Sequence, residues 1–119
     1  MVTHNNEIYG KPKDAENAKQ MLKKFSGQTQ FVYSGVCIYQ GELEKCVVFS
    51  EATEVNFDEL SDDVIEGYVN TGEPMDKAGS YGIQGIGGTL VKSIKGDYFN
   101  VVGFPLHRFC KEMQKILQK

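Results

Sequence analysis

Two long runs rich in β-branched and aromatic residues constrain the fold of this chain more than any other feature. The runs are QFVYSGVCIYQ (30–40) and EKCVVFSEATEVNF (44–57), and only the residues GEL separate them. This composition is typical of β-strands, and so short a separation allows two neighbouring strands to pair as a hairpin. We therefore expect two strands here, with a hairpin as one way of pairing them.

Three helical segments surround these runs. Asp14 is the expected N-cap of a one-faced helix over DAENAKQMLKKFSG, which stops at Gly27. Ser61 is the expected N-cap of a helix over DDVIEGYVN, where two aspartates in the first turn complement the helix dipole. Pro105 opens a third helix. Its apolar face carries Leu106, Phe109, Met113, Ile116 and Leu117.

A second hairpin is expected near the end of the chain. The runs TLVKSI (89–94) and YFNVVGF (98–104) bracket the turn KGD, a pattern typical of paired strands. The opening segment, MVTHNNEIYGKPKD, resembles the end of a strand that runs into a loop. Together the elements predict a single α/β domain over residues 1–119, with a mixed sheet and flanking helices.

Charge and composition exclude several classes of protein. Of the 119 residues, 40% are hydrophobic and 24% are charged, and no apolar run is long enough to span a membrane. Thirteen basic and sixteen acidic residues give a net charge of −3, which argues against broad electrostatic binding of nucleic acid. The cysteines, which lack any C-x-x-C spacing, predict neither a disulfide framework nor a zinc site, and they fit a reducing, intracellular compartment. They are Cys37, Cys46 and Cys110.

The segment GEPMDKAGSYGIQGIGG (72–88) is the main candidate for a functional loop. It holds six of the thirteen glycines together with Glu73, Asp76, Lys77 and Gln84. It matches neither the P-loop nor the dinucleotide-binding fingerprint. Glycines let backbone N–H groups approach an anion closely, and carboxylate, ammonium and amide groups lie among them. A surface loop whose glycines only form turns is the alternative that composition leaves open.

Lys11 is a second candidate, because Gly10 and Pro12 flank it. The fixed φ of the proline can aim the lysine at phosphate oxygens, whereas a solvated turn lysine is the alternative. His107 and Cys110 lie three positions apart on the last predicted helix. No third or fourth ligand lies near them in the sequence, so we assign no metal site to this pair.

Four blocks of the chain resemble, in the same order, the Maf family of nucleoside triphosphate pyrophosphatases. They are GKPKDAENAKQMLKKFSG, FVYSGV, TEVNFDELSDDVIEGYVNTGEPMDKAGSYGIQGIGG and GDYFNVVGFPL, which together reach across most of the chain. The part from GEPMDKAG to GIQG is the most specific. NVVGFPLHRFCK is also similar to the animal branch in which such a domain is fused to an acetylserotonin O-methyltransferase-like domain.

The resemblance implies a fold like that of Maf and inosine triphosphate pyrophosphatase proteins, and a cytoplasmic hydrolase of nucleotide house-cleaning. Such an enzyme uses a divalent metal, Mg²⁺ or Mn²⁺, to hydrolyse dTTP- or UTP-type nucleotides to a monophosphate and pyrophosphate. Lys11 matches the phosphate-side lysine of the family's GKP motif and is the catalytic residue that we carry over. Lys77 matches the lysine of the DKAG block. Gln84 matches the glutamine of GIQG, which is associated with base choice.

These matches predict a substrate site in the glycine-rich segment. We expect Gln84, Lys77, Glu73 and Asp76 to bind the nucleotide, with Lys11 facing the same cleft. The amide of Gln84 has a donor and an acceptor that can complement N3–H and O4 of uracil or thymine. For the two carboxylates, holding a metal and tethering the loop both remain open as roles.

The resemblance also implies groups that this chain does not contain. Family members carry, upstream, an S-x-S-P-R-R turn and an aspartate that is the family's proposed general base. A carboxylate activates water and cations neutralise the phosphoryl group, so we expect much slower hydrolysis without them. The chain is interpreted as the C-terminal portion of the fold, lacking the N-terminal strands and leaving an exposed edge or apolar face. A non-catalytic nucleotide-binding or regulatory fragment is the alternative, and a homodimer or pairing with a longer isoform is the expected assembly.

Overall fold

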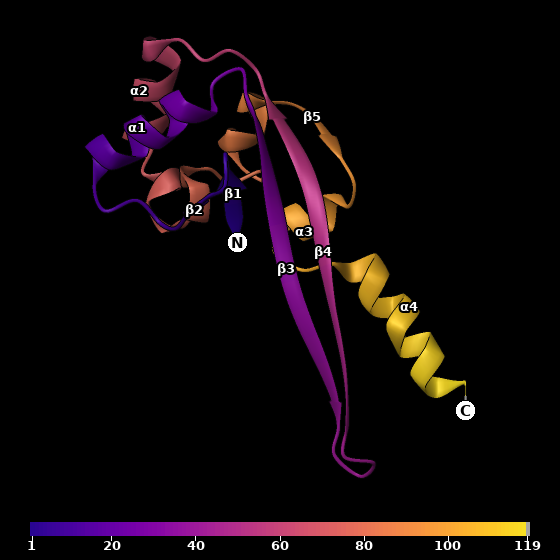
Figure 1. The fold of residues 1–119 in the computed structure, drawn as a ribbon. Helices are drawn as coiled ribbons and strands as arrows, with labels where there is room; N and C mark the ends of the chain where they lie inside the picture. The colour runs from indigo at the N-terminus through magenta and orange to yellow at the C-terminus, as the bar shows by residue number, and fades with distance from the viewer. Residues whose placement is uncertain (119) are drawn as a thin grey trace.

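A five-stranded sheet organises residues 1–118, which are the residues that the computed structural model describes (Figure 1). The strand order is β2-β1-β3-β4-β5, and each neighbouring pair is antiparallel. The strands are β1 (Val2–His4), β2 (Glu7–Tyr9), β3 (Thr29–Gln40), β4 (Lys45–Phe57) and β5 (Val91–Lys95). The predicted α/β class with flanking helices is confirmed, whereas the sheet is antiparallel throughout rather than mixed.

The two long sequence runs form a hairpin, β3–β4. Their register extends from Thr29 opposite Asn56 to Gln40 opposite Lys45. The far end of this hairpin projects beyond the rest of the chain (Figure 1), and the molecule measures 55 Å along its longest axis against 26 and 25 Å along the others. The buried residues of β3, Gln30 and Val32, lie in its first part only. Further along the hairpin the sheet is largely open to solvent, except at Phe49 of β4, which is buried beneath Arg108 of the last helix.

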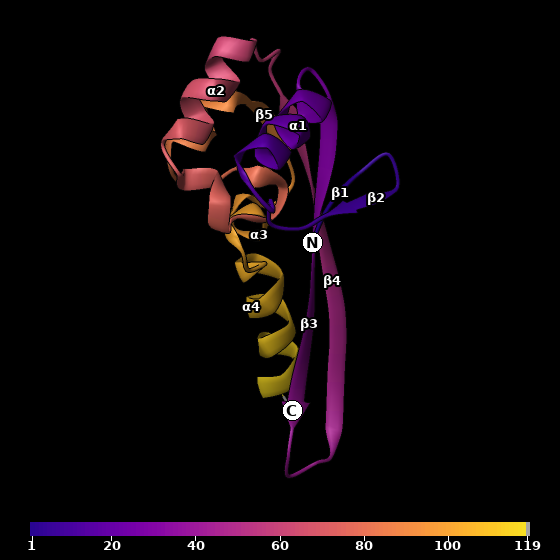
Figure 2. The same cartoon turned by 90° about the vertical axis from the view of Figure 1, so that its left-hand side faces the viewer.

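The helices are α1 (Ala15–Phe25), α2 (Asp62–Asn70), α3 (Tyr98–Val102) and α4 (Leu106–Leu117). The three predicted helices begin and end close to where the sequence predicts, and a fourth, α3, lies where a strand was predicted. The Asp14 carboxylate accepts a hydrogen bond from the Asn17 amide at 2.8 Å, and the Ser61 hydroxyl accepts one from the Val64 amide at 3.2 Å. Both predicted N-caps are therefore confirmed. Seen edge-on, α2, α3 and α4 lie on the same side of β3 and β4 (Figure 2).

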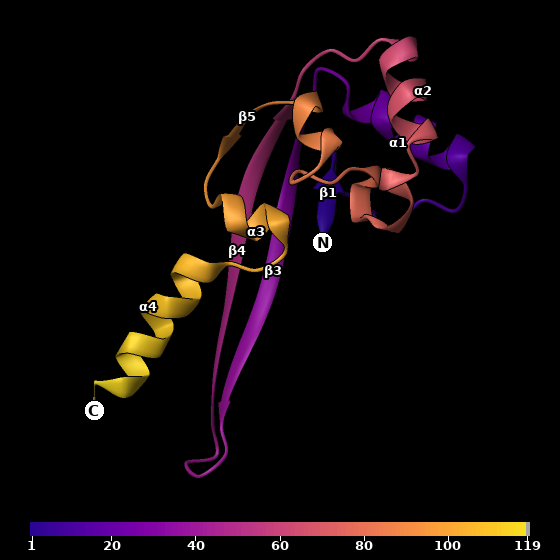
Figure 3. The same cartoon turned by 180° about the vertical axis from the view of Figure 1, so that it is seen from behind.

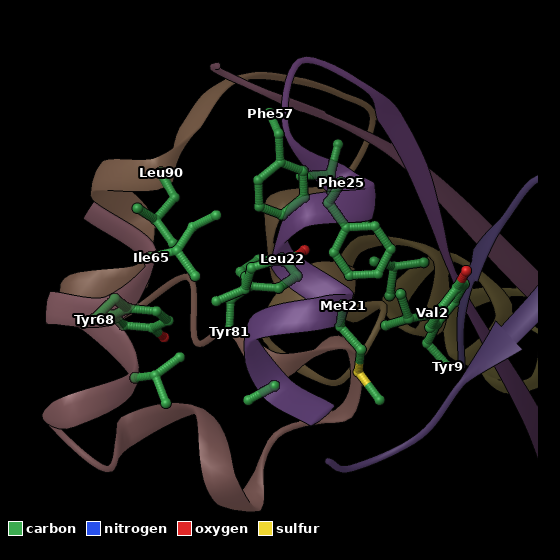
Figure 4. Close-up of a cluster of buried hydrophobic side chains, with 14 residues drawn as sticks. Val2, Tyr9, Met21, Leu22, Phe25, Phe57, Ile65, Tyr68, Tyr81 and Leu90 are labelled. Carbon is green, nitrogen blue, oxygen red and sulfur yellow. The ribbon is translucent and has the colours of Figure 1, made fainter. Parts of the chain in front are cut away.

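Aromatic side chains join the first helix, the sheet and the glycine-rich segment into one core (Figure 4). The ring of Phe25, on α1, stacks on Phe57 of β4 with centroids 5.6 Å apart. Phe57 meets the ring of Tyr81 edge-on at 5.0 Å. The Tyr81 hydroxyl donates a hydrogen bond of 3.0 Å to the side-chain oxygen of Gln30, on β3. Tyr81 thereby fixes the glycine-rich segment to the sheet.

The prediction of a second hairpin is wrong for its second strand, expected over residues 98–104. The first run does form β5, which pairs with β4, but the second run begins with the helix α3. The Asp97 carboxylate caps this helix by accepting from the Phe99 amide at 2.8 Å. Asn100 is fully buried, and its side-chain NH₂ donates to the Val32 carbonyl and to the Thr53 hydroxyl, both at 3.0 Å. These contacts hold α3 against β3 and β4 (Figure 3) and override the strand preference of Tyr, Phe and Val.

The N-terminal segment is more regular than the sequence suggested. Instead of one strand and a loop, β1 and β2 form a short hairpin, and β1 also pairs with β3. Asn5 and Asn6 make the turn with φ angles of 50° and 66°. Asparagine tolerates this left-handed region better than most residues, so the Asn-Asn pair was a turn signal.

A disulfide joins Cys37 to Cys46, which corrects the prediction that the cysteines form no disulfide framework. The two residues are diagonal neighbours on the hairpin, because Cys37 lies opposite Val48 and Cys46 lies opposite Tyr39. Their Cα atoms are 6.3 Å apart, within the range that a disulfide can span. Cys110 is free and exposed. The cysteines therefore no longer favour a reducing compartment, where disulfides are rare.

Much apolar surface stays in contact with solvent. On α4, which follows Pro105 as predicted, Leu117 is 75% exposed, whereas Glu112 is buried and pairs with Arg108 at 3.0 Å. On the hairpin, Tyr39 is 66% and Val48 is 74% exposed. None of the helices within residues 1–118 has the length and apolar character needed to cross a membrane.

Replacing Asn100 with alanine is expected to destabilise the fold by about 1–3 kcal/mol, because the buried carbonyl of Val32 loses its side-chain donor. Urea unfolding measures the change. Asn70→Ala, at the exposed end of α2, is the matched control and should stay within about 0.5 kcal/mol of the wild-type chain. Equal losses in the two variants would contradict the anchoring role of Asn100.

Candidate functional site

The glycine-rich segment folds into three short 3-10 turns rather than an open loop. They are η1 (Glu73–Asp76), η2 (Ala78–Ser80) and η3 (Ile86–Leu90). The segment follows directly from α2, because Gly72 has a φ of 79° and reverses the chain at the end of that helix. Side chains from α2 and from the three turns can therefore meet within one small volume.

The carboxylate of Glu73 lies at the centre of this arrangement. It accepts hydrogen bonds from the Tyr68 hydroxyl, from the Ile86 amide at 3.0 Å and from the Gly87 amide at 2.9 Å. The Tyr68 hydroxyl also accepts a hydrogen bond of 3.0 Å from the amide of Gly82. Two side chains thus hold both ends of the backbone between residues 82 and 87.

The electrostatics of this pair follow from its contacts. Burial raises the pKa of the Glu73 carboxyl, but the hydrogen bonds from Tyr68, Gly87 and Ile86 and the charge of Lys77 outweigh burial, so the pKa lies below its usual range. Burial, together with the hydrogen bond to Glu73, raises the pKa of the Tyr68 hydroxyl well above its usual range. Glu73 is therefore an ionised acceptor and Tyr68 a neutral donor at neutral pH.

Two glycines in the segment are needed because the segment packs closely on itself. A Cβ atom on Gly85 would overlap the carboxylate of Glu73. A Cβ atom on Gly87 would lie 2.5 Å from the Tyr68 hydroxyl oxygen and 2.6 Å from the Gly82 carbonyl oxygen. At these two positions, glycine is explained by contacts within the protein rather than by the approach of a ligand.

A cavity of about 540 Å³ opens beside the segment. This volume lies within the range of small-molecule sites. One wall comes from the glycine-rich segment, and the others come from the start of β1, from β3 and from α3 with the residues after it. Its side chains include Val2, Val32, Ser34, Glu73, Lys77, Tyr81, Gln84 and Asn100.

The structure brings together only some of the residues predicted for the site. Glu73, Lys77 and Gln84 line the cavity, and Gln84 is exposed. Asp76 and Lys11 are not among the lining residues. The sequence left two roles open for Glu73, holding a metal or tethering the loop, and its contacts are those of a tether.

Asp76 and Lys11 lie just outside the cavity. The ammonium of Lys77 is 3.2 Å from the Asp76 carboxylate, and both side chains are exposed. The hydrogen bond and charge of Lys77 hold the pKa of Asp76 below its usual range, and the charge of Lys11 acts in the same direction. The Gly79 amide donates to the Gly10 carbonyl at 3.1 Å, which brings the turn containing Lys11 beside η2.

Sequence reasoning missed three residues of this region. Ser34 and Asn100 line the cavity, and the Tyr68 hydroxyl holds the glycine-rich segment by its hydrogen bonds to Glu73 and Gly82. Tyr68 lies on the buried face of a predicted helix, five positions before Glu73, and that placement was its available signal. Asn100 carried no signal, because the sequence placed it in a strand.

Within residues 1–118, the side chains do not form a protein-only metal site. No group of three or more His, Cys, Asp or Glu residues there is arranged to hold an ion. The Glu73 carboxylate is already engaged by three donors, and Asp76 pairs with Lys77.

Comparison with known proteins adds independent evidence. Residues 1–116 match the family model described as Maf-like protein. A dTTP/UTP pyrophosphatase of Bacillus cytotoxicus is 50% identical over 115 residues, which are 97% of this chain and 59% of that relative. One of Pyrococcus furiosus is 55% identical over 106 residues, 89% of this chain and 55% of the relative. One of Clostridium beijerinckii is 49% identical over 118 residues, 99% of this chain and 62% of the relative. The chain thus spans between 55% and 62% of the length of these curated relatives.

Acid is expected to weaken the contacts of Glu73. Its folded-state pKa is lowered, so its ionised form contributes stability above the ordinary glutamate pKa of about 4.3, and that contribution is lost as the pH falls through the folded-state pKa. Urea unfolding at a series of acidic pH values should therefore give a smaller loss of stability for Glu73→Gln than for the wild-type chain. Glu59→Gln, at an exposed position, is the control and should follow the wild type. A parallel pH dependence in wild type and Glu73→Gln would contradict the shifted pKa.

Proposed function

Because the chain belongs to the Maf-like protein family, we propose that it serves the hydrolysis of dTTP- and UTP-type nucleotides to a monophosphate and pyrophosphate. The observation that carries the proposal is the match to relatives named dTTP/UTP pyrophosphatase, at about 50% identity over 97% of this chain in one case. The relatives are longer than this chain, so their activity is proposed for it and is to be tested directly.

The cavity supports a role in nucleotide binding. Gln84 is exposed on its wall, and its amide can donate to O4 and accept from N3–H of uracil or thymine. Lys77 lines the same wall and can neutralise phosphate oxygens as a point charge. A phosphate that approaches Lys77 would compete with Asp76, its present partner. We propose Lys11, in the turn beside η2, as a second phosphate cation from outside the cavity.

Two components of the reaction, the divalent metal and the general base, are not assigned to residues of the cavity. A divalent metal is proposed from family membership, and the carboxylates described above do not fit a protein-only cage, so we derive no step through a metal. Among the cavity-lining residues given above, Glu73 is the carboxylate, and its hydrogen bonds make it a poor general base. We therefore assign binding and charge neutralisation, but no water activation, to these residues.

Location and assembly also belong to the proposal. Cytoplasmic location rests on the family resemblance, since the Cys37–Cys46 disulfide removes the support that the cysteines first offered. Self-association, or pairing with a longer chain, is supported by the exposed apolar side chains of the hairpin, such as Tyr39 and Val48.

The test is pyrophosphate release from UTP and dTTP by the purified 119-residue chain, with Mg²⁺ or Mn²⁺, beside a full-length relative. Binding of UTP, dTTP and CTP is measured in parallel by calorimetry. We expect UTP to bind more tightly than CTP. We expect hydrolysis to be at least about 100-fold slower than that of the relative, because no general base is assigned among the cavity residues. Failure to bind UTP or dTTP would refute the proposed function.

Gln84→Glu is expected to lower the ratio of UTP to CTP affinity at least about 10-fold, because an ionised carboxylate cannot donate to O4 of uracil but can accept from the amino group of cytosine. Calorimetric titration of both nucleotides measures the ratio. Gln114→Glu, exposed on α4, adds the same charge outside the cavity and should leave the ratio unchanged. An unaltered ratio in Gln84→Glu would remove Gln84 from base recognition.

A further inference from the structure

We propose that Tyr68 and Glu73 are positioning residues for Gln84, and that they set where its side chain starts on the cavity wall by holding both ends of the backbone that carries it. This inference rests on the proposed function, in which Gln84 contacts the base. It adds that base discrimination depends on a hydroxyl and a carboxylate that hold the backbone on either side of Gln84.

The Gln84 side chain is exposed, and no hydrogen bond to its amide is observed within residues 1–118. The point at which this side chain starts on the cavity wall is therefore set by its backbone. That backbone is held before Gln84 by the Gly82 amide, which donates to Tyr68, and after it by the Ile86 and Gly87 amides, which donate to Glu73.

The two holding groups are joined to each other and to the core. The Tyr68 hydroxyl donates to the Glu73 carboxylate, and the Tyr68 residue is only 3% exposed, in the core beside Ile65 and Leu22. Helix α2 is therefore the rigid element from which the segment is positioned. Hydrogen bonds to an ionised acceptor are stronger than those between neutral groups, which suits a structural tether.

Close packing also restricts movement of the backbone of residues 82–87 toward the side chains of Tyr68 and Glu73. The positions that side chains would occupy on Gly85 and Gly87 are filled by the Glu73 carboxylate and the Tyr68 hydroxyl. Local turn hydrogen bonds, from the Gly85 amide to the Gly82 carbonyl at 3.2 Å and from the Gly88 amide to the Gly85 carbonyl at 3.1 Å, complete the shape. Loss of either holding group should therefore free the segment without removing apolar side chains from the core.

Tyr68→Phe separates positioning from folding. It removes the hydroxyl and keeps the ring in the core, so the chain should remain folded. Glu73→Gln keeps the size of the side chain but replaces one acceptor oxygen with a donor. The matched controls are Tyr98→Phe, on a tyrosine that is 40% exposed, and Glu59→Gln, on an exposed glutamate.

The experiment has two measurements on the complete chain. Hydrogen exchange of the backbone amides is followed at Gly82, Ile86 and Gly87, and calorimetry gives the affinities for UTP and CTP. In both variants we expect exchange at these amides to rise at least about 10-fold, and the ratio of UTP to CTP affinity to fall at least about 10-fold. Amides of α1 and both control variants should be unchanged.

The outcomes distinguish this inference from the proposed function. A wild-type chain that binds UTP and CTP equally would refute base recognition, and the positioning of Gln84 with it. A wild-type preference for UTP that survives both substitutions would refute only the positioning. Faster exchange with an unchanged affinity ratio would also overturn the inference, because the tether would then be structural alone.

Discussion

The hydrogen bonds to the Glu73 carboxylate determine the shape of the whole glycine-rich segment. A carboxylate that is partly removed from water is stable only when protein donors replace that water, and Glu73 receives one side-chain and two backbone donors. Those donors come from α2 and η3, which are separated by the rest of the segment. One charged group therefore joins α2 to the far part of the segment, and the glycines leave the space that this requires.

The segment depends in turn on the aromatic core. Tyr81 packs on Phe57, Phe57 stacks on Phe25, and the Tyr81 hydroxyl reaches Gln30 of β3. Close packing of this kind transmits position from the sheet to the segment, because interiors have little free volume in which side chains can shift. The cavity lies where the glycine-rich segment faces β3 and α3. Packing in the core therefore positions the wall formed by the sheet, and hydrogen bonds to Glu73 and Tyr68 position the wall formed by the segment.

Local signals in the sequence predicted much of the fold. The N-caps at Asp14 and Ser61, the start of α4 after Pro105 and the long strands β3 and β4 all agree with the structure. Each depends on residues that are neighbours in sequence, which is why composition and spacing were sufficient. Family resemblance, carried by the blocks around the glycine-rich segment, also predicted the family that the comparisons found. Within the site, Glu73, Lys77 and Gln84 were predicted from that resemblance and line one cavity.

The predictions that proved wrong concerned features that depend on contacts between residues far apart in the sequence. The segment after Asp97 has the composition of a strand, yet Asn100 anchors it as a helix through Val32 and Thr53. The cysteines form a disulfide because the hairpin register makes Cys37 and Cys46 diagonal neighbours, and no spacing rule contains that register. The sequence by itself determined the ends of α1 and α2, the start of α4, the two long strands and the residue types of the candidate site. Only the tertiary structure decided that Tyr68 joins this site, that Glu73 faces inward as a tether and that Lys11 lies outside the cavity, because burial and hydrogen bonding between distant segments set those positions.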